Sequence, residues 1–463
     1  MIKKRIIIVG AGPAGIAASL VLSKELKEKA EIILIDQGKR IEERTRDAFD
    51  KNFGFGGVGA YSDGKFVFEN IFGNREIGTN LHELIGQEKE KEYLIKAKLM
   101  FKFFYRRAFK KDPEEISEER IKKAKEIQRI ASQNDMNYIL ARDYHVGTDK
   151  LPFLIKEFQK EIENNGVILK TNERVIDFEK NILITEKQKY NYDYLLIAPG
   201  RHGCLWLDNL LKKKNIAHST RPIDIGFRIE VDAALVEHLS SIERDMKLEF
   251  RHPNGDLIRT FCSCPYGVVV KESAKPEFSG AKFNLVNGMS NSKKLSDNTN
   301  FALLVRMPLR DEARNNIYGQ KIAEIYYESG IERPVLQRLG DLKMGRSSKK
   351  EKMNEWRVKP TLRDVTIGDV RIGMPARIMD DILYGIKKLS VQGLMHGLDQ
   401  DSTLLYGPEI KFHGIKILTD EYLQSISLPG IYFAGDGTGF SRGIGGAMAS
   451  GIRAAEGILR DFK

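Results

Sequence analysis

The feature that most constrains the fold is a glycine motif near the start of the chain, Gly10-Ala-Gly-Pro-Ala-Gly15. It follows an apolar run over residues 4–9 that is typical of a buried strand, and it precedes apolar residues at helical spacing over 13–27. A second apolar run lies at residues 31–36. This order predicts a β-α-β unit with two parallel strands and a right-handed crossover.

Each glycine of the motif has a separate role in binding a dinucleotide. Gly10 permits a tight turn, Gly12 lets the backbone approach a pyrophosphate, and Gly15 lets the helix pack closely on the strand. The N–H groups and positive dipole end of the helix attract the phosphates. Asp36 ends the second strand, where a carboxylate binds ribose hydroxyls and disfavours the 2′-phosphate of NADP. The contacts predicted for this unit are Gly10, Gly12, Pro13, Ala14, Gly15, Asp36 and Gln37.

A second glycine-rich segment, near the other end of the chain, favours FAD over NAD. A predicted strand over residues 430–434 ends in a glycine-rich turn, and a helix over about 444–460 follows. FAD is long and needs a second contact remote in sequence from the first. The Asp436 carboxylate can accept hydrogen bonds from ribityl hydroxyls, and the helix N-terminus would stabilise the negative charge of reduced flavin. The predicted contacts are Gly435, Asp436, Gly443, Ile444, Gly445, Gly446 and Ala447, with Ala198 and Gly200 after a further apolar strand at 194–198.

The remaining segments complete an α/β pattern. Charged helices are predicted over about 88–110 and 114–133, a helix capped by Thr148 over 149–164, and a polar loop over 287–300. We expect a Rossmann-like FAD-binding domain built from separate segments, with an inserted α+β substrate or cap domain and a helical insertion. The predicted boundaries are 1–80, 140–222 and 405–463 for the FAD-binding domain, 85–140 for the helical insertion and 223–404 for the inserted domain.

Composition narrows the class of protein. No stretch approaches the roughly 18 apolar residues of a membrane span, and the three cysteines exclude a metal site made of cysteines alone and argue against a disulfide framework. We therefore expect a cytoplasmic protein without a transmembrane segment. The net charge of +11 is consistent with an acidic partner, such as an electron-carrier protein, an anionic substrate or tRNA, or with a lysine-rich surface that has no role. We expect no stable complex with nucleic acid.

Five segments in this order resemble a known family. They are Gly56–Lys65, Asp224–Glu230, Phe261–Pro265, Asn287–Ser290 and Gly435-Asp436. Together with the first glycine motif they are similar to uncharacterised FAD-dependent dehydrogenases that carry an FAD-dependent protein C-terminal domain, within the glutathione-reductase-like FAD superfamily. The resemblance spans almost the whole chain, although longer relatives carry an N-terminal extension that this chain lacks.

The resemblance implies further contacts with the cofactor and the substrate. It places Gly56, Gly57, Ser62, Asp63 and Lys65 along the FAD, and it turns the strand of Arg228 and Glu230 and the Cys-x-Cys segment toward the flavin. Relatives carry a Glu-Thr-Arg type of motif where this chain has Glu409-Ile-Lys411, so a lysine stands here in place of the arginine of the relatives. The candidate catalytic residues are Arg228, Glu230, Cys262, Cys264 and Tyr266.

Several candidates keep alternative interpretations. Cys262 and Cys264 are either a redox pair, thiols in the substrate pocket, or residues that serve only packing. Arg228 and Glu230 contact the substrate or form a surface ion pair, and Arg442 is a further candidate for substrate contact. The scattered histidines His145, His202, His396 and His413 are either proton donors or structural.

The predicted activity is that of an FAD-dependent oxidoreductase, a dehydrogenase or reductase. It would move a hydride through flavin N5 to or from a small organic substrate, with NAD(P)H or reduced ferredoxin as a transient electron donor. No second dinucleotide motif is present for a dedicated NAD(P) domain. A flavin-dependent tRNA-modifying enzyme and a non-catalytic flavoprotein are the alternative hypotheses.

Overall fold

The N-terminal apolar runs form the middle of a five-stranded parallel sheet. The computed structural model describes residues 3–45, 47–72, 79–274, 282–307, 309, 314–412 and 414–462. In this sheet β1 (Lys4–Val9) lies between β2 (Ala30–Ile35) and β9 (Tyr194–Ile197), and β5 (Ile168–Lys170) and β21 (Ile431–Phe433) form the edges. All four strand pairs are parallel. The fold is therefore mixed α/β, as predicted, and both ends of the chain contribute to one sheet.

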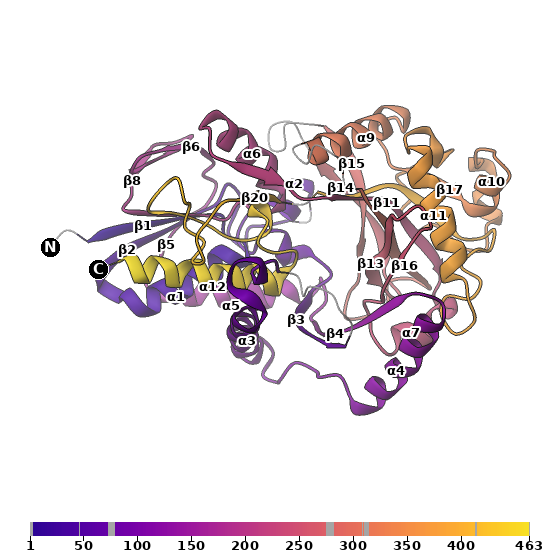
Figure 1. Cartoon of the computed structure of the whole chain (residues 1–463), viewed down its shortest axis with the longest axis horizontal. Helices are drawn as coiled ribbons and strands as arrows, with labels where there is room; N and C mark the ends of the chain where they lie inside the picture. The colour runs from indigo at the N-terminus through magenta and orange to yellow at the C-terminus, as the bar shows by residue number, and fades with distance from the viewer. Residues whose placement is uncertain are drawn as a thin grey trace.

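Elements on both faces bury this sheet, which explains why its strands are continuously apolar. Four helices form one hydrophobic core with it: α1 (Pro13–Leu26), α3 (His82–Phe109), α5 (Leu151–Asn164) and α12 (Ile444–Asp461). On the other side, above the sheet in Figure 1, lie α6 (Cys204–Lys213) and a meander of β6 (Val175–Glu179), β7 (Ile182–Thr185) and β8 (Lys189–Asn191).

A second, mostly antiparallel sheet of nine strands forms the other half of the molecule. The strand order is β18-β17-β19-β11-β16-β13-β12-β4-β3. The strands are β3 (Lys65–Phe72), β4 (Asn137–His145), β11 (Ile223–Asp232), β12 (Lys247–Arg251), β13 (Leu257–Cys264), β16 (Asn298–Met307), β17 (Val335–Arg338), β18 (Thr366–Ile367) and β19 (Leu404–Lys411). Strands β3, β4 and β19 bring residues from outside 223–404 into this sheet, and the hairpin of β14 (Val268–Ala274) and β15 (Phe283–Met289) lies beside it.

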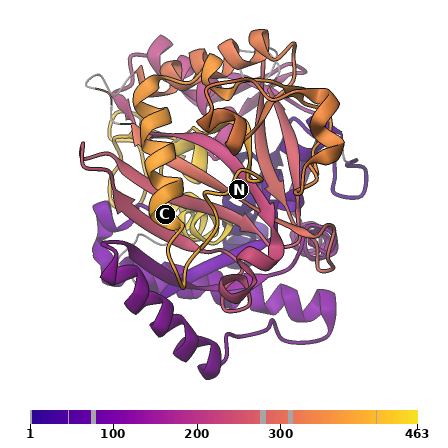
Figure 2. The same ribbon diagram turned by 90° about the vertical axis from the view of Figure 1, so that its right-hand side faces the viewer.

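The central strand β11 shows how this sheet is oriented. Its alternate residues from Ile223 to Val231 are apolar and belong to a core shared with α9 (Asn315–Ser329) and α11 (Ala376–Leu389). The residues between them include Asp224, Arg228 and Glu230, which are also fully buried. Because side chains alternate along a strand, one face packs on the helices seen over the sheet in Figure 2, and the charged face turns toward the first half.

Most predicted elements are confirmed, with small shifts at their ends, and two predictions are wrong. The predicted polar loop 287–300 is strand at both ends, because β15 continues to Met289 and β16 begins at Asn298. The buried Asn298 at the start of β16 donates to the Lys359 carbonyl at 2.8 Å. Thr148 does not cap α5, since its hydroxyl donates to the Ser62 and Ser290 carbonyls.

The chain crosses between the two halves through a short paired ribbon. Strand β10 (His218–Thr220) leads into β11, and β20 (Ile415–Ile417) leads away from β19; the two pair antiparallel. The remaining described helix of more than ten residues, α4 (Glu118–Gln133), packs on β4, and Ser117 caps its first turn through the Arg120 N–H. In the part of the chain that the structure describes, no helix has the length and apolar character needed to cross a membrane.

Candidate cofactor and substrate site

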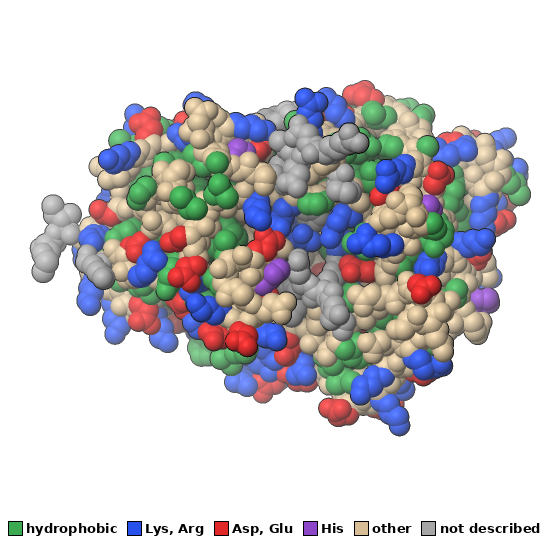
Figure 3. Space-filling model, viewed as in Figure 1, with side chains coloured by type: hydrophobic (Ala, Val, Ile, Leu, Met, Phe, Trp, Pro, Cys, Tyr) green, Lys and Arg blue, Asp and Glu red, His purple; other side chains and the backbone are tan. Residues whose placement is uncertain are grey.

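A cavity of about 610 Å³ lies between the parallel sheet and the charged face of the second sheet. Its walls come from both ends of the chain and from the middle. In Figure 3 lysine and arginine side chains gather at the centre of the face, between the two halves of the molecule. The volume is in the ordinary range for cofactor and small-molecule sites, which is about 300–1,000 Å³.

The glycines of the first motif are required for different reasons. Gly10 has φ +100°, and a Cβ there would lie 2.1 Å from the Ala198 carbonyl oxygen; a Cβ on Gly15 would lie 2.0 Å from the Gly10 carbonyl oxygen. These two glycines therefore serve the fold itself. Gly12 differs, because a Cβ there would meet no described atom within 4 Å, and Gly12 lines the cavity. The empty space beside Gly12 is where a bound ligand can approach the backbone.

Two helices direct their N-termini at this cavity. The N-cap positions of α1 and α12 are Gly12 and Gly443, and neither helix has a side-chain cap or an acidic residue in its first turn, as far as the described residues show. The first N–H groups of a helix need acceptors. Phosphate and other anionic or polar ligand groups supply such acceptors. This arrangement fits a long dinucleotide that contacts both helices.

Asp36 lines the cavity and is largely held by the backbone. Its Oδ1 accepts from the Gly38 and Gly54 N–H groups at 2.8 and 2.9 Å, and its Oδ2 accepts from the Ala11 N–H at 2.8 Å. A carboxylate offers about four acceptor sites. The remaining capacity, chiefly on Oδ2, fits the predicted bond from a ribose hydroxyl. Gln37 lines the same part of the cavity.

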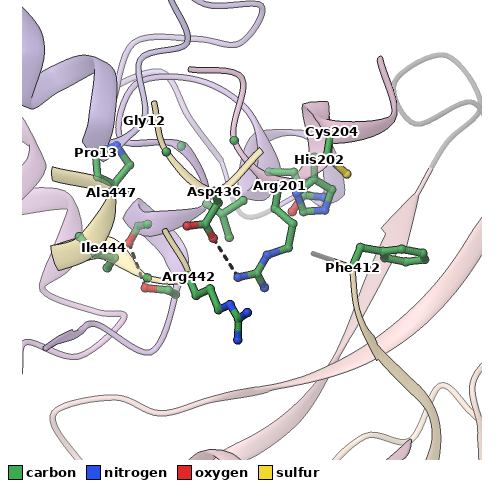
Figure 4. A pocket seen from close by; sticks show the side chains of 18 of the residues that line it. Gly12, Pro13, Arg201, His202, Cys204, Phe412, Asp436, Arg442, Ile444 and Ala447 are labelled. Carbon is green, nitrogen blue, oxygen red and sulfur yellow. Dashed lines mark hydrogen bonds and ion pairs between the residues drawn. The ribbon is translucent and has the colours of Figure 1, made fainter. Parts of the chain in front are cut away.

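Asp436 lies where the strand β21 leads into α12, and two side chains orient it. Ser441 donates to Oδ1 at 2.8 Å and Arg201 donates to Oδ2 at 2.9 Å. Figure 4 shows Arg201 pointing at Asp436, with Arg442 nearby and Phe412 across the cavity. The chain positions this carboxylate in the cavity wall, where it is able to accept a ligand hydroxyl.

The glycine-rich loop over 53–64 also reaches the cavity. Gly57 has φ +57°, and a Cβ there would lie 3.2 Å from the Gly12 Cα, so the loop lies directly on the first motif. Lys65 Nζ is 2.9 Å from Asp63 Oδ2 and 3.6 Å from Asp245 Oδ1. Burial alone would lower the pKa of Lys65, but Asp245 and Asp63 raise it well above its usual value.

The structure brings most of the predicted cofactor residues into the lining of one cavity. The predicted residues that line it are Gly10, Gly12, Pro13, Ala14, Asp36, Gln37, Gly57, Ser62, Asp63, Lys65, Ala198, Gly200, Gly435, Asp436, Gly443, Ile444, Gly445, Gly446 and Ala447. Gly15 and Gly56 lie behind the lining, and of the five candidate catalytic residues only Cys262 is part of it. That the lining residues contact FAD directly stays a prediction.

Four of the five candidate catalytic residues lie outside the lining, namely Arg228, Glu230, Cys264 and Tyr266. Arg228 and Glu230 are fully buried, which corrects the alternative of a surface ion pair. Arg228 donates to Asn300 Oδ1 at 2.8 Å and to the Cys262 carbonyl at 2.7 Å. Glu230 accepts hydrogen bonds from the hydroxyls of Thr361 and Tyr406, and burial raises its pKa. The hydroxyl of Tyr266 donates to Glu237, and the ring lies under Lys294.

The histidines occupy different environments. His202 lines the cavity with its Nε2 3.1 Å from Glu272 Oε1, and its Nδ1 has no hydrogen-bond partner among the described residues. Burial lowers the pKa of His145 to about 4. His396 lines a separate hollow, and His413 lies outside the described residues.

Sequence reasoning missed the cationic wall on the second sheet. The charged groups of Arg259 and Lys411 lie 5.2 and 5.4 Å from the ring centre of Phe261, and all three residues line the cavity. Arg259 donates to Asp224, but its buried Nε has no hydrogen-bond partner in the described ranges. The only sequence signal for this wall is the alternation of charged and apolar residues along β11, which shows that this face of the sheet is polar.

Arg201 and Glu272 were missed as well. They line the cavity and hold Asp436 and His202 respectively. Arg201 follows the strand predicted at 194–198, and no motif in the sequence distinguishes either residue from an ordinary surface charge.

Comparisons with known proteins agree with a flavin site. Residues 222–411 match the model of an "FAD-dependent protein, C-terminal domain-like" family, and residues 416–459 match that of "Flavin containing amine oxidoreductase". An uncharacterized protein of Clostridium beijerinckii is 25% identical over 504 residues, which cover 100% of this chain and 82% of that protein.

Solved structures overlap with the chain more weakly. Glycine oxidase from Geobacillus kaustophilus matches with 12% identity and a TM-score of 0.43, covering 99% of this chain and 95% of that one. L-proline dehydrogenase from P. horikoshii matches with 11% identity and a TM-score of 0.36, covering 100% and 94%. These values carry no conclusion about the substrate. The two family matches and the cavity together identify a flavoprotein that binds FAD.

Proposed function

We propose, from the premise that this chain is an FAD-dependent oxidoreductase, that it is a dehydrogenase or reductase for a small organic anion. Its FAD-binding part would be of the glutathione-reductase type, with the nine-stranded sheet serving as an inserted substrate domain. The observation that carries the proposal is a shared cavity: the glycine turns of both chain ends and the cationic face of the second sheet line the same space. A cofactor held by the first wall therefore meets a substrate held by the second.

The chain's own residues divide into two groups by role. Gly12, Asp36, Asp436 and Gly443 would hold FAD along the parallel sheet, through helix N–H groups at one end and carboxylates at the ribose and ribityl hydroxyls. When bound, FAD supplies hydride transfer at its N5 atom. The chain contributes binding, orientation and charge around that chemistry.

The cationic wall would select and orient the substrate. Arg259 keeps one buried donor, Nε, without a protein acceptor, and an unsatisfied buried donor costs about 1–3 kcal/mol. A carboxylate or similar anion would satisfy it and would add to the ion pairs that Arg259 and Lys411 already make with Asp224 and Glu409. The ring of Phe261, close to both cations, provides an apolar surface for the rest of the substrate.

His202 is the residue best placed to handle a proton. Glu272 holds its Nε2, its buried Nδ1 has no hydrogen-bond partner among the described residues, and both residues line the cavity. An imidazole held at one nitrogen can take or give a proton at the other. We infer that His202 exchanges the substrate proton that accompanies hydride transfer.

Anaerobic spectroscopy of the purified protein tests this function. We expect the absorbance of bound flavin, its bleaching by NADH, NADPH or reduced ferredoxin, and its return when a panel of oxidised organic acids is added. If a carrier protein is the donor, its rate should fall with salt, because attraction between an acidic carrier and a basic surface is screened. A colourless protein that cannot be loaded with FAD would overturn the proposal.

The anion specificity has its own test in Arg259→Met. Methionine keeps much of the side-chain volume and removes the charge and the free donor. We expect the KM for carboxylate substrates to rise about 10-fold or more, which corresponds to about 1.4 kcal/mol, while the matching neutral amides change little. Equal effects on acids and amides would refute an anion site at this wall.

A further inference from the structure

Two cysteines meet at a bulge in the strand that borders the cavity. Between Phe261 and Cys264 the register of β13 against β16 shifts, so that three steps on β13 oppose two on β16. Cys262 adopts φ +50°, in the left-handed region. The two sulfur atoms lie within 4.8 Å of one another as a result. In a regular strand, side chains two residues apart point to the same face but do not touch.

The two thiols have unlike surroundings. Cys262 lines the cavity and donates from Sγ to Asp63 Oδ2 at 3.2 Å. Cys264 is fully buried, and the fully buried Arg228 donates to its Sγ at 3.4 Å. Gly288 leaves the room that Arg228 needs, since a Cβ there would lie 1.6 Å from the guanidinium Nη2. The buried arginine is therefore fixed against the inner sulfur.

These surroundings make the inner thiol the more acidic of the two. The side-chain hydrogen bond between the two cysteines, helped by the charges of Arg228 and Lys65, lowers the pKa of Cys264, although burial opposes it. The hydrogen bond with Cys264, burial and the charge of Asp63 together raise the pKa of Cys262 well above its usual value. The pair thus combines one thiol that ionises more easily than usual with one that ionises less easily.

A metal ion is a poor occupant for this cluster. Asp63, Cys262 and Cys264 bring three ligand atoms together. Two cations already neutralise them, because Lys65 Nζ lies 2.9 Å from Asp63 and Arg228 lies 3.4 Å from Cys264. A divalent cation would have to displace both or endure their repulsion. The cluster instead has the features of reactive cysteines, which are electropositive surroundings and a path to solvent through the cavity.

We propose that Cys262 and Cys264 are a redox pair that exchanges two electrons with the FAD of the same chain. Formation of the S–S bond from one thiol and one thiolate releases two electrons and one proton. Oxidised FAD takes up two electrons and one proton to reach its anionic reduced form, so atoms and charge balance without another reactant. Strained disulfides are the labile and catalytic ones, and a bond across one intervening residue at a bulge belongs to this class. This role builds on the proposed oxidoreductase function and adds a second two-electron centre to it.

The first test examines the thiols themselves and does not depend on enzyme turnover. The holoenzyme is equilibrated anaerobically in buffers of graded dithiothreitol ratio, alkylated while denatured, and digested for mass spectrometry. We expect Cys262 and Cys264 to lose both alkyl groups together, reversibly, in a single peptide that is 2 Da lighter, while Cys204 stays alkylated throughout. Two cysteines that stay alkylated in every buffer, or that oxidise singly or between chains, would overturn the proposal.

The second test counts electrons. Reductive titration of the oxidised holoenzyme should consume four electrons per FAD, whereas Cys262→Ser and Cys264→Ser should each consume two. Cys204→Ser, which removes a buried thiol at the start of α6, is the matched control and should keep four. Uptake of two electrons by the wild type refutes the pair but leaves the oxidoreductase function intact. Failure to reduce the flavin at all would instead refute that function.

Discussion

Replacing Gly12 by alanine separates cofactor binding from folding. The residue has φ −79° and ψ −178°, an extended conformation open to any amino acid, and a Cβ there would meet no described atom within 4 Å. We therefore expect the free energy of unfolding of the apoprotein to change by less than about 1 kcal/mol. The added methyl group would occupy the space that the pyrophosphate needs. Losing one charged hydrogen bond costs about 1.5–3 kcal/mol, so the Kd for FAD should rise about 10- to 100-fold.

Gly10→Ala is the matched control and should show the opposite pattern. Its φ of +100° and the 2.1 Å approach of a Cβ to the Ala198 carbonyl affect the protein itself. A left-handed conformation costs about 1–2 kcal/mol and overpacking about 1–3 kcal/mol. The apoprotein should lose roughly 2–5 kcal/mol of stability by the sum of these two effects.

Both variants are measured in the same way. Urea unfolding of the apoproteins gives stability, and quenching of flavin fluorescence during titration gives the Kd for FAD. If Gly12→Ala binds FAD as tightly as the wild type while folding normally, the phosphates do not lie beside Gly12. If Gly12→Ala loses as much stability as Gly10→Ala, the space beside Gly12 belongs to the fold and not to the ligand.

Three further predictions concern single side chains. Gly443→Ala should resemble Gly12→Ala, because a Cβ there also meets no described atom within 4 Å. We expect near-normal stability of the apoprotein and a raised Kd for FAD. An unchanged Kd would contradict this prediction. Asp436→Asn should weaken FAD about 10-fold in the same titration, since a loss of about 1.4 kcal/mol corresponds to that factor, and equal binding would exclude a carboxylate contact. Hydrogen bonds from Arg221 and Lys416 lower the pKa of Glu83 to about 2, although burial opposes them. The ionised Glu83 carboxylate stabilises the fold at pH values above its pKa in the unfolded chain, and this stabilisation is lost as the pH falls through its pKa in the folded protein. Glu83→Gln should therefore cost about 1–2 kcal/mol near pH 6 and close to nothing near pH 2. A cost that did not depend on pH would refute this reasoning.

The glycine motifs could be predicted from sequence because their physics is local. A turn with positive φ, or a close approach between two backbones, is decided by one residue and its neighbours along the chain. Gly10 and Gly15 show this directly, since their absent Cβ atoms would overlap with backbone oxygens. The pairing of the two chain ends into one sheet followed from the same patterns, because each glycine turn ends a predicted strand.

The substrate wall could not be predicted in the same way. Arg259 and Lys411 lie on strands β13 and β19, far apart in sequence, and β11 and β16 lie between those strands in the sheet. Only the register of that sheet brings them together around Phe261. For the same reason Glu230 and Tyr266, which a linear pattern could not distinguish from cavity residues, lie outside the lining.

The pairing of the first and last segments also fixes when the protein can acquire its cofactor. Gly12 and Gly443 line one cavity but are far apart in sequence, so Gly443 is translated long after Gly12. At about 5–20 residues per second, roughly 20–90 s pass between them. Until β21 is made, β9 is an open edge of the parallel sheet, and α12 is missing from α1. Cofactor loading is therefore a step that follows the synthesis of β21 and α12, and the colour of bound flavin would report that the parallel sheet has been closed.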